Sequence, residues 1–250
     1  MVCGAAHTGI NEEQKLRYHT KPMAKSRNIV GSTTYQNIKH DIIFGKLAPA
    51  SKLKLEALRE RYSASMSTLR ETLNRLASEG FVDAEEQRGF FVSAVSPEDL
   101  VEIANLRVLL ECHALLLSIK NGDADWEGNL VAAHHKLHIM EKKMLNGELT
   151  ATEDWKRYDW EFHKALIAAC GSQNLLSLHS VLFDKYLRYQ MLVLTHRGEK
   201  AVHEHSELLD AALRRDETRA TNILRLHIER GLNHSAAVFQ SAGAESTQPV

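Results

Sequence analysis

The sequence holds 250 residues, of which 44% are hydrophobic and 25% are charged, and its formal net charge is −1. These proportions are typical of a soluble globular protein with one or two domains, and no apolar run approaches the roughly 18 residues of a bilayer-spanning helix, so we expect no membrane partner. The N-terminal stretch has no basic patch followed by an apolar core, and the three cysteines are few and far apart, so we expect a cytoplasmic protein without a disulfide framework.

The first elements in chain order are three short helices. Residues 1–30 are polar and have no sustained period, so we expect a flexible tail there. Helical spacing of apolar residues begins near Thr34, and Gly45 ends this helix. A second short helix is expected over residues 55–62 and a third over about 67–78, with a turn of small hydroxyl residues between them.

The apolar period changes after the third helix. Residues 81–95 hold two short apolar runs around a polar turn, which is the pattern of a small β-hairpin. Three helices followed by a hairpin predict a winged helix-turn-helix domain over residues 31–95, whose third helix would enter the major groove of DNA. The charge distribution is consistent with two separate functions, because residues 1–94 carry a net charge of +4 and residues 95–250 a net charge of −5.

From residue 96 to about residue 240, the sequence pattern predicts helices and no strands. Ser96 is a suitable N-cap for a helix that begins with Pro97. Amphipathic spacing then continues in segments separated by short polar breaks, at about 97–121, 125–146, 152–169, 175–196, 200–214 and 217–240. We therefore predict a mainly α protein in which an all-helical bundle over residues 96–240 follows the DNA-binding domain. Residues 241–250 are expected to form a second flexible tail.

An acidic residue and a histidine lie one turn apart on a helix surface that faces inward. Asp159 and His163 are four residues apart, so they are neighbours on one helix face, and the apolar residues around them indicate that this face looks into the bundle. A carboxylate oxygen and an imidazole nitrogen are suitable ligands for a divalent metal. His205 and His227 also lie on the apolar faces of their helices. One carboxylate and three imidazoles from three helices predict a site for zinc, nickel or a related metal.

Simpler interpretations of these residues are also consistent with the sequence. An inward histidine is more often a hydrogen-bonded core residue than a ligand, and Asp159 and His163 can form a buried hydrogen bond. His134 and His138 are a rival pair with the same spacing, but they lie at the edge of their apolar stripe, so we interpret them as a surface pair. His203 lies on the side of its helix that we expect to face water.

A second charged pair, Arg107 and Glu111, lies four residues apart within a run of leucines. One interpretation is an intrahelical ion pair, which contributes only about a few tenths of a kcal/mol. The other is an arginine that holds a carboxylate by two parallel hydrogen bonds. The sequence alone favours neither interpretation.

Short motifs along the chain resemble those of a known family. The segment YSASMSTLRETLNRLASEGFV, followed by RGFFV, resembles the DNA-binding domain of the GntR family of bacterial transcriptional regulators. The D-x-x-x-H motif at residues 159–163, followed by His205 and then His227, resembles the effector-binding domain of its FadR subgroup, of the metal-binding FCD type. The resemblance covers roughly residues 34–240, and the order and spacing of the motifs are more specific than any single one.

The resemblance implies a homodimer that binds a palindromic operator in double-stranded DNA and takes up a small carboxylate effector, which often contacts the metal and an arginine. Carried over position by position, the DNA-contacting residues would be Ser65, Ser67, Thr68 and Arg70 of the recognition helix and Arg88 and Gly89 of the wing. The metal ligands, with zinc as the expected ion, would be Asp159, His163, His205 and His227. Arg107 and Asn174 would line the effector pocket.

Two departures from the family pattern concern DNA recognition. The family usually has Pro-Gly where this sequence has Pro-Ala at 49–50, and it often has a basic residue at the position of Met66. A basic residue at this position would contact a phosphate or a guanine of the operator. Because Met66 cannot make this contact, we expect an operator that differs from the commonest one of the family. Arg70 can contact a phosphate, which positions the protein without specifying sequence, or pair with Glu60 or Glu71; we favour the DNA contact.

The resulting leading hypothesis is a ligand-responsive transcription factor, a repressor rather than an enzyme. A helical-bundle metalloenzyme acting on a small carboxylate is the alternative, because three histidines and one aspartate can leave an open metal position. No clear general base accompanies the four residues, and residues 34–95 would then have no purpose. A third hypothesis is a protein–protein adaptor whose histidines are purely structural.

Overall fold

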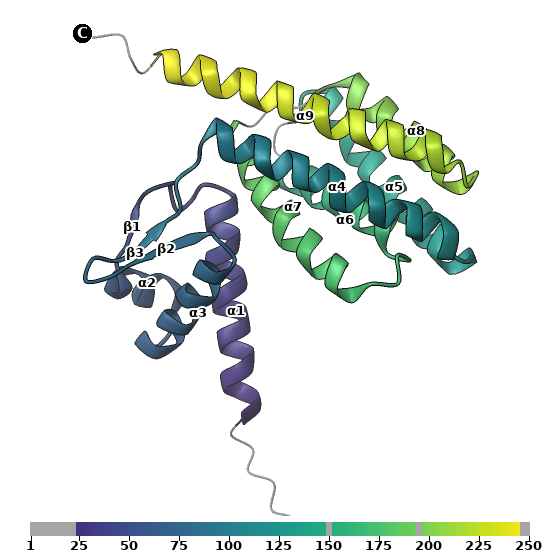
Figure 1. Ribbon diagram of the computed structural model, residues 1–250. Helices are drawn as coiled ribbons and strands as arrows, with labels where there is room; N and C mark the ends of the chain where they lie inside the picture. The colour runs from purple at the N-terminus through teal and green to yellow at the C-terminus, as the bar shows by residue number, and fades with distance from the viewer. Residues whose placement is uncertain (1–23, 149–151, 194–196, 246–250) are drawn as a thin grey trace, which may run out of the picture.

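The computed structural model describes residues 24–148, 152–193 and 197–245. Two parts follow one another along the chain (Figure 1). The N-terminal part, which we call the head, comprises α1 (Ala24–Ile43), β1 (Lys52–Leu53), α2 (Leu55–Tyr62), α3 (Met66–Ser78), β2 (Val82–Glu85) and β3 (Gly89–Val92). The C-terminal part, the bundle, comprises α4 (Pro97–Asn121), α5 (Ala124–Leu145), α6 (Thr152–Ile167), α7 (Gln173–Val193), α8 (Glu199–Leu213) and α9 (Glu217–Glu245).

The head is a winged helix-turn-helix. Helix α3 begins where Ser65 caps it, because the Ser65 side chain accepts a hydrogen bond from the Thr68 backbone nitrogen at 3.1 Å. Its apolar stripe, which includes Leu69 and Leu73, is fully buried in the core of the head. The strands form an antiparallel sheet in the order β1-β3-β2, and β2 and β3 are the expected hairpin. The sequence analysis missed β1, because two residues are too few to show an alternating pattern.

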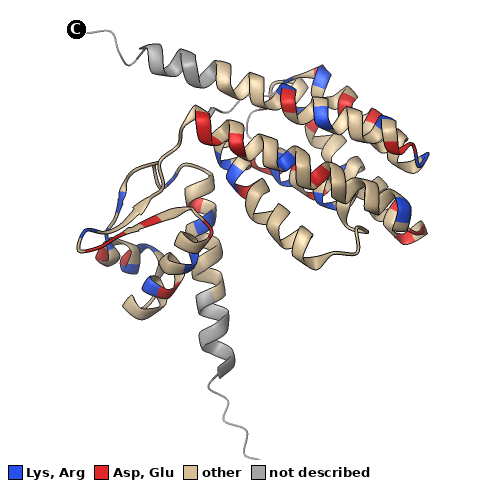
Figure 2. Ribbon diagram, viewed as in Figure 1, with Lys and Arg blue, Asp and Glu red and all other residues tan. Residues whose placement is uncertain are grey.

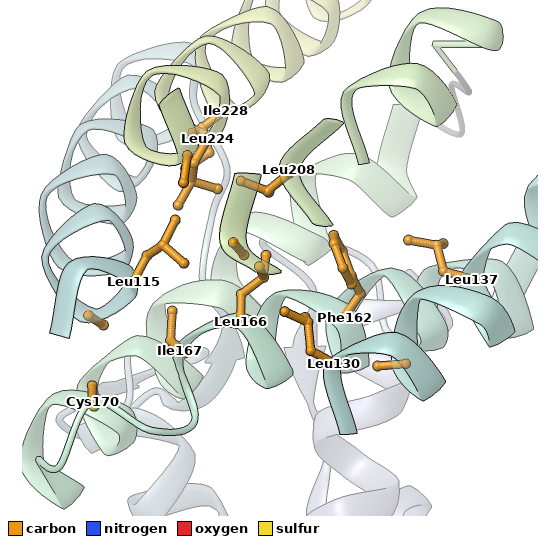
Figure 3. Packing of buried hydrophobic residues seen from close by; sticks show 14 of the residues in the cluster. Leu115, Leu130, Leu137, Phe162, Leu166, Ile167, Cys170, Leu208, Leu224 and Ile228 are labelled. Atoms are coloured by element: carbon orange, nitrogen blue, oxygen red, sulfur yellow. The ribbon is translucent and has the colours of Figure 1, made fainter. Parts of the chain in front are cut away.

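The bundle begins at the N-cap expected from the sequence. The Ser96 side chain accepts a hydrogen bond from the Asp99 backbone nitrogen at 3.1 Å, and α4 begins with Pro97. The apolar faces of the helices then meet in one core, where Leu115, Leu166 and Leu224 lie among fully buried neighbours (Figure 3). The mainly α fold is therefore confirmed. Among the described residues, no helix combines the length and the apolarity that crossing a membrane requires.

The ends of the helical parts differ from the expected tails. Helix α1 begins at Ala24 rather than near Thr34, and α9 continues to Glu245, so residues 24–30 and 241–245 are helical. Neither segment shows an apolar stripe, so the period of the sequence gave no signal there. The other residues of the two expected tails, 1–23 and 246–250, lie outside the described residues.

Helix α7 belongs to both parts of the molecule. Its residues Phe183, Leu187 and Met191 are buried in the same apolar cluster as the core of the head, whereas Tyr186 and Tyr189 are buried in the core of the bundle. Figure 1 shows α7 between α1 and the rest of the bundle. This shared helix fixes how the head is attached to the site described next.

Candidate metal and effector site

The structure brings together the four side chains that the sequence singled out as metal ligands. Asp159 and His163 come from α6, His205 from α8 and His227 from α9, and all four are buried. The Nε2 atom of His205 lies 3.4 Å from Oδ1 of Asp159, and the Nε2 atom of His163 lies 3.9 Å from the same oxygen. One nitrogen of each histidine lies within 4.8 Å of a nitrogen of the other two. Three helices thus bring three imidazoles together, and the Asp159 carboxylate lies beside two of them.

Two of the nitrogens that face this point have no hydrogen-bond partner among the described residues. They are Nε2 of His163 and Nε2 of His205, and both are buried. Leaving a buried polar atom unpaired costs about 1–3 kcal/mol, and most buried polar atoms in folded proteins are paired. A metal ion bound by these two nitrogens and by Asp159 would satisfy both of them.

The opposite ring nitrogen of each histidine is held by a glutamate. His205 Nδ1 donates to Glu141 at 2.6 Å, and His227 Nδ1 lies 2.8 Å from Glu204 and 2.9 Å from the Arg197 guanidinium. The third pair is His163 Nδ1 with Glu111. A carboxylate on one ring nitrogen favours the tautomer that leaves the other nitrogen free as a ligand, which is the usual arrangement around metal-binding histidines. In the part of the chain that the structure describes, the glutamate acts alone at His205, whereas the Arg107 guanidinium also lies 3.2 Å from Nδ1 of His163.

These residues fit a divalent ion of the zinc class. An ion that holds nitrogen and oxygen ligands at about 2.1 Å in tetrahedral or octahedral geometry separates neighbouring ligand atoms by about 3.0–3.4 Å. The 3.4 Å between His205 and Asp159 is at the upper end of this range, whereas the 3.9 Å between His163 and Asp159 exceeds it, so the ligand side chains would have to move closer around an ion. Three imidazoles and one carboxylate suit zinc, nickel and cobalt better than calcium or magnesium, which prefer oxygen ligands.

The electrostatic surroundings favour the protonation states that metal binding needs. Burial lowers the pKa of His163 and holds the pKa of His227 well below its ordinary value. Burial alone would raise the pKa of Asp159, but nearby positive charge, above all that of Lys156, outweighs it and keeps this pKa below its usual range. The two imidazoles are therefore neutral and the aspartate is ionised at neutral pH, which are the states of metal ligands.

A small cavity with cationic walls is lined by three of the four side chains, those of Asp159, His205 and His227. It has a volume of about 20 Å³, enough for about one water molecule. Lys156 lies in its wall, with its Nζ 3.5 Å from Asp159 and 3.0 Å from Gln190. Arg197 lies in the wall as well and is paired with Glu204 at 3.0 Å. A ligand of several atoms therefore enters this space only if wall side chains such as Lys156 move.

Arg107 and Asn174 do not line this cavity. Arg107 is buried on the far side of His163, where its guanidinium is 2.8 Å from Glu111 and lies over the Phe183 ring. The intrahelical ion pair of Arg107 and Glu111 therefore forms, but it is fully buried and also contacts a candidate ligand. Asn174 is exposed in the first turn of α7.

The remaining histidines are partly as expected. His203 is confirmed on the water-facing side of α8, with 75% of its side chain exposed. The prediction that His134 and His138 form a surface pair is wrong, because both are half-buried, their rings stack and His134 packs against Phe162. Side chains of α6 cover this edge of α5, which the pattern of α5 alone does not reveal.

Sequence analysis missed several residues around the centre. Glu141 continues the apolar stripe of Leu130 and Leu137 at the next inward position, so its spacing was a usable signal. Lys156 lies three residues before Asp159 on the same buried face and was detectable in the same way. The pairing of Glu204 with His227 joins two helices and has no local signal in the sequence.

The residues expected to contact DNA lie on the outer surface of the head. Ser65, Ser67, Arg70, Arg88 and Gly89 are exposed and Thr68 is half-buried. Within the described part of the chain, Arg70 pairs with neither Glu60 nor Glu71, so its guanidinium is available to a phosphate. Arg88 pairs with Glu85 at the tip of the wing. Figure 2 shows that basic and acidic residues alternate along the ribbon of the head.

Comparison with known proteins decides the family. A model of bacterial regulatory proteins of the gntR family matches residues 31–92, and a model of the FCD domain matches residues 102–230. The chain belongs to the gntR family of bacterial regulatory proteins. It is 37% identical to BphR of Paraburkholderia xenovorans, an uncharacterised HTH-type transcriptional regulator, over 85% of this chain and 87% of that one. It is also 32% identical to the HTH-type transcriptional repressor GlaR of Escherichia coli, over 78% of this chain and 90% of that one.

The fold of this GntR-family regulator recurs in solved structures. That of McbR/YncC from E. coli matches with a TM-score of 0.69 and 19% identity, over 85% of this chain and 98% of that one. A winged helix-turn-helix followed by a helical FCD domain is therefore shown. The protein is a DNA-binding transcription regulator and not an enzyme. The metalloenzyme alternative is set aside.

Proposed function

We propose that this regulator is a cytoplasmic repressor of the FadR subgroup whose operator affinity is controlled by a small carboxylate bound at a metal centre. The observation that carries the proposal is the set of three buried histidines whose outer nitrogens lie against glutamates and whose inner nitrogens lie close together, with Asp159 beside those of His163 and His205. The four side chains would hold zinc or a related ion. The ion would supply a positive docking point for the effector carboxylate.

The charges around the centre support an anionic effector. The carboxylates of Asp159, Glu111, Glu141 and Glu204 are buried, and so are the cations of Arg107 and Lys156; Arg197 is nearly so. Four negative and three positive charges leave a net charge of −1, and a divalent ion changes it to +1. A monocarboxylate would then bring the buried charge to zero, which lowers the cost of desolvation. Lys156 and Arg197 are placed to hold a second polar group of the effector.

A homodimer is part of this proposal. Leu106 and Leu109 of α4 are 49% and 66% exposed, and Val101 of the same helix is 42% exposed, so the outer side of α4 carries apolar residues. In a symmetric dimer the same apolar surface of each protomer would be buried against the other. Leu109→Lys is expected to shift the protein from dimer to monomer in sedimentation at micromolar concentration. A monomeric wild-type protein, or a variant that stays dimeric, contradicts this assignment.

Palindromic operator binding would place one α3 helix in each of two major grooves. Ser65, Ser67, Thr68 and Arg70 would contact DNA from α3 and its cap, and Arg88 and Gly89 from the wing. The test is fluorescence anisotropy with the DNA upstream of the protein's own gene, at two salt concentrations. Affinity should exceed that for scrambled DNA and fall with salt. Arg70→Ala should weaken binding and reduce the salt slope by about one unit. Equal affinity for both DNAs contradicts the proposal.

Effector binding is tested separately, by adding small mono- and dicarboxylates to the protein with and without a chelator and measuring its melting temperature and operator affinity. At least one compound should raise the melting temperature and reduce operator affinity, and the chelator should abolish both effects. Asp159→Asn should behave as the chelated wild-type protein does. Carboxylate effects that persist after the metal has been removed would show that the ion is not the docking point.

A further inference from the structure

The attachment of the head to the bundle depends on a buried lysine that bridges both parts. Lys39 of α1 places its Nζ 2.7 Å from Asp184 of α7 and 3.0 Å from Glu79, the residue that ends α3. The Tyr35 hydroxyl donates to the same Glu79 carboxylate at 2.6 Å. The lysine is buried, so removing either acidic partner leaves a poorly solvated charge at the junction. The C-terminal end of the recognition helix is thereby tied to α7.

The same helix α7 is tied to the metal centre on its other side. His179 lies five residues before Asp184, which places the two side chains on nearly opposite faces of the helix. His179 donates from Nε2 to Glu111 at 3.1 Å, and Glu111 holds Nδ1 of His163. The position of α7 therefore depends on the same glutamate that orients a candidate metal ligand.

Phe183 is a second link between the two sides. Its ring centroid lies 5.5 Å from that of His163, and the Arg107 guanidinium lies 4.3 Å from it. Phe183 is nevertheless part of the apolar cluster that forms the core of the head, together with Ile38 and Leu76. A shift of His163 cannot be accommodated without moving this ring, because the side chain is fully buried and closely packed.

The junction is not packed throughout. Beside the lysine, a groove of about 650 Å³ is lined by residues of α1, α6 and α7, with Arg157 and Trp160 on the bundle side. Partly open junctions of this kind let domains rotate relative to each other. The fixed contacts at Lys39 and Phe183 would then act as the points about which the head turns.

We infer that α7 couples the metal centre to the recognition helix, with Lys39, Asp184 and Phe183 as the positioning residues of regulated DNA binding. The inference rests on the proposed metal site. Binding of the ion orders His163 and Glu111, Glu111 holds His179, and α7 transmits the ordering to Lys39 and Glu79. The physical basis is one rigid helix with contacts to both sites, which is the requirement for a coupling free energy between them.

The experiment is hydrogen exchange of the full-length protein, after chelation and again after addition of zinc. In the wild-type protein zinc should slow exchange in α6, α8 and α9, and also in α1 and α3 by about fivefold, a typical coupling factor. Asp184→Asn should keep the effect in α6, α8 and α9 but lose that in α1 and α3. Asp184→Glu, which retains the charge, should restore most of it.

Lys136→Met is the matched control, because it removes another lysine ion pair between two helices, with Glu161 at 3.4 Å on the surface of the bundle. It should leave the zinc response of α1 and α3 unchanged. Two results would overturn the coupling but not the metal centre. One is a wild-type protein in which zinc slows exchange in α6, α8 and α9 but not in α1 and α3. The other is an Asp184→Asn variant in which zinc still slows exchange in α1 and α3 as much as in the wild-type protein. Absence of any response overturns the metal centre and the coupling together.

Discussion

The head and the bundle are built on different principles. The core of the head is apolar, and ionisable groups such as Lys39 and Glu79 lie at its edge. The bundle has an apolar core as well, but a cluster of buried carboxylates, cations and imidazoles lies inside it. An apolar core is stable by itself, whereas a buried polar cluster with unpaired nitrogens is not. The comparison indicates that the core of the head is stable without a ligand, whereas the stability of the bundle depends on what it binds.

The largest expected effect distinguishes the two cores. Leu73→Ala in the head removes a fully buried side chain and should lower the free energy of unfolding by about 2–5 kcal/mol, equally with and without zinc. His205→Gln in the bundle should instead abolish the zinc-dependent stabilisation, which reaches about 4 kcal/mol at a thousandfold excess over the dissociation constant. Urea unfolding of both variants, with zinc and with chelator, measures this. A zinc-dependent cost for Leu73→Ala contradicts the comparison.

A smaller effect is expected at the glutamates that hold the histidines. Glu141→Gln retains the size of the side chain but weakens its hydrogen bond to His205 Nδ1. Zinc affinity should fall by about 10–100-fold, as is typical when the partner of a ligating histidine is changed. Competition with a fluorescent chelator measures this affinity. Glu161→Gln, on the outer surface of the same bundle, is the control. If it lowers zinc affinity as much as Glu141→Gln does, Glu141 has no special role in holding His205.

The dependence on pH should also separate the two parts. His163 and His227 have lowered pKa values when folded, so the unfolded chain binds more protons than the folded one below its own histidine pKa of about 6.5. The stability of the metal-free bundle should therefore fall as the pH decreases from 7 to 5. His227→Gln should reduce this dependence. A metal-free stability that rises over the same range would contradict the assignment of buried neutral imidazoles.

The sequence predicted those parts of the molecule that have a local period. The six bundle helices and three head helices follow from apolar spacing, and Asp159, His163, His205 and His227 stand out because they are polar residues on apolar stripes. The pairings around them could not be predicted, because Glu111 with His163 or Lys39 with Asp184 depends on which helices become neighbours. The first turns of α1 were missed since they carry no apolar stripe.

The most direct test of the central claim is X-ray absorption spectroscopy of the zinc-loaded protein, with the metal content measured on the same sample. The account predicts one zinc per chain, bound by nitrogen and oxygen atoms at about 2.0–2.1 Å, with the scattering pattern of three imidazoles. His205→Gln should lose one imidazole or the metal itself. A wild-type protein that binds no stoichiometric metal, or a spectrum with fewer than two imidazoles, would contradict the account.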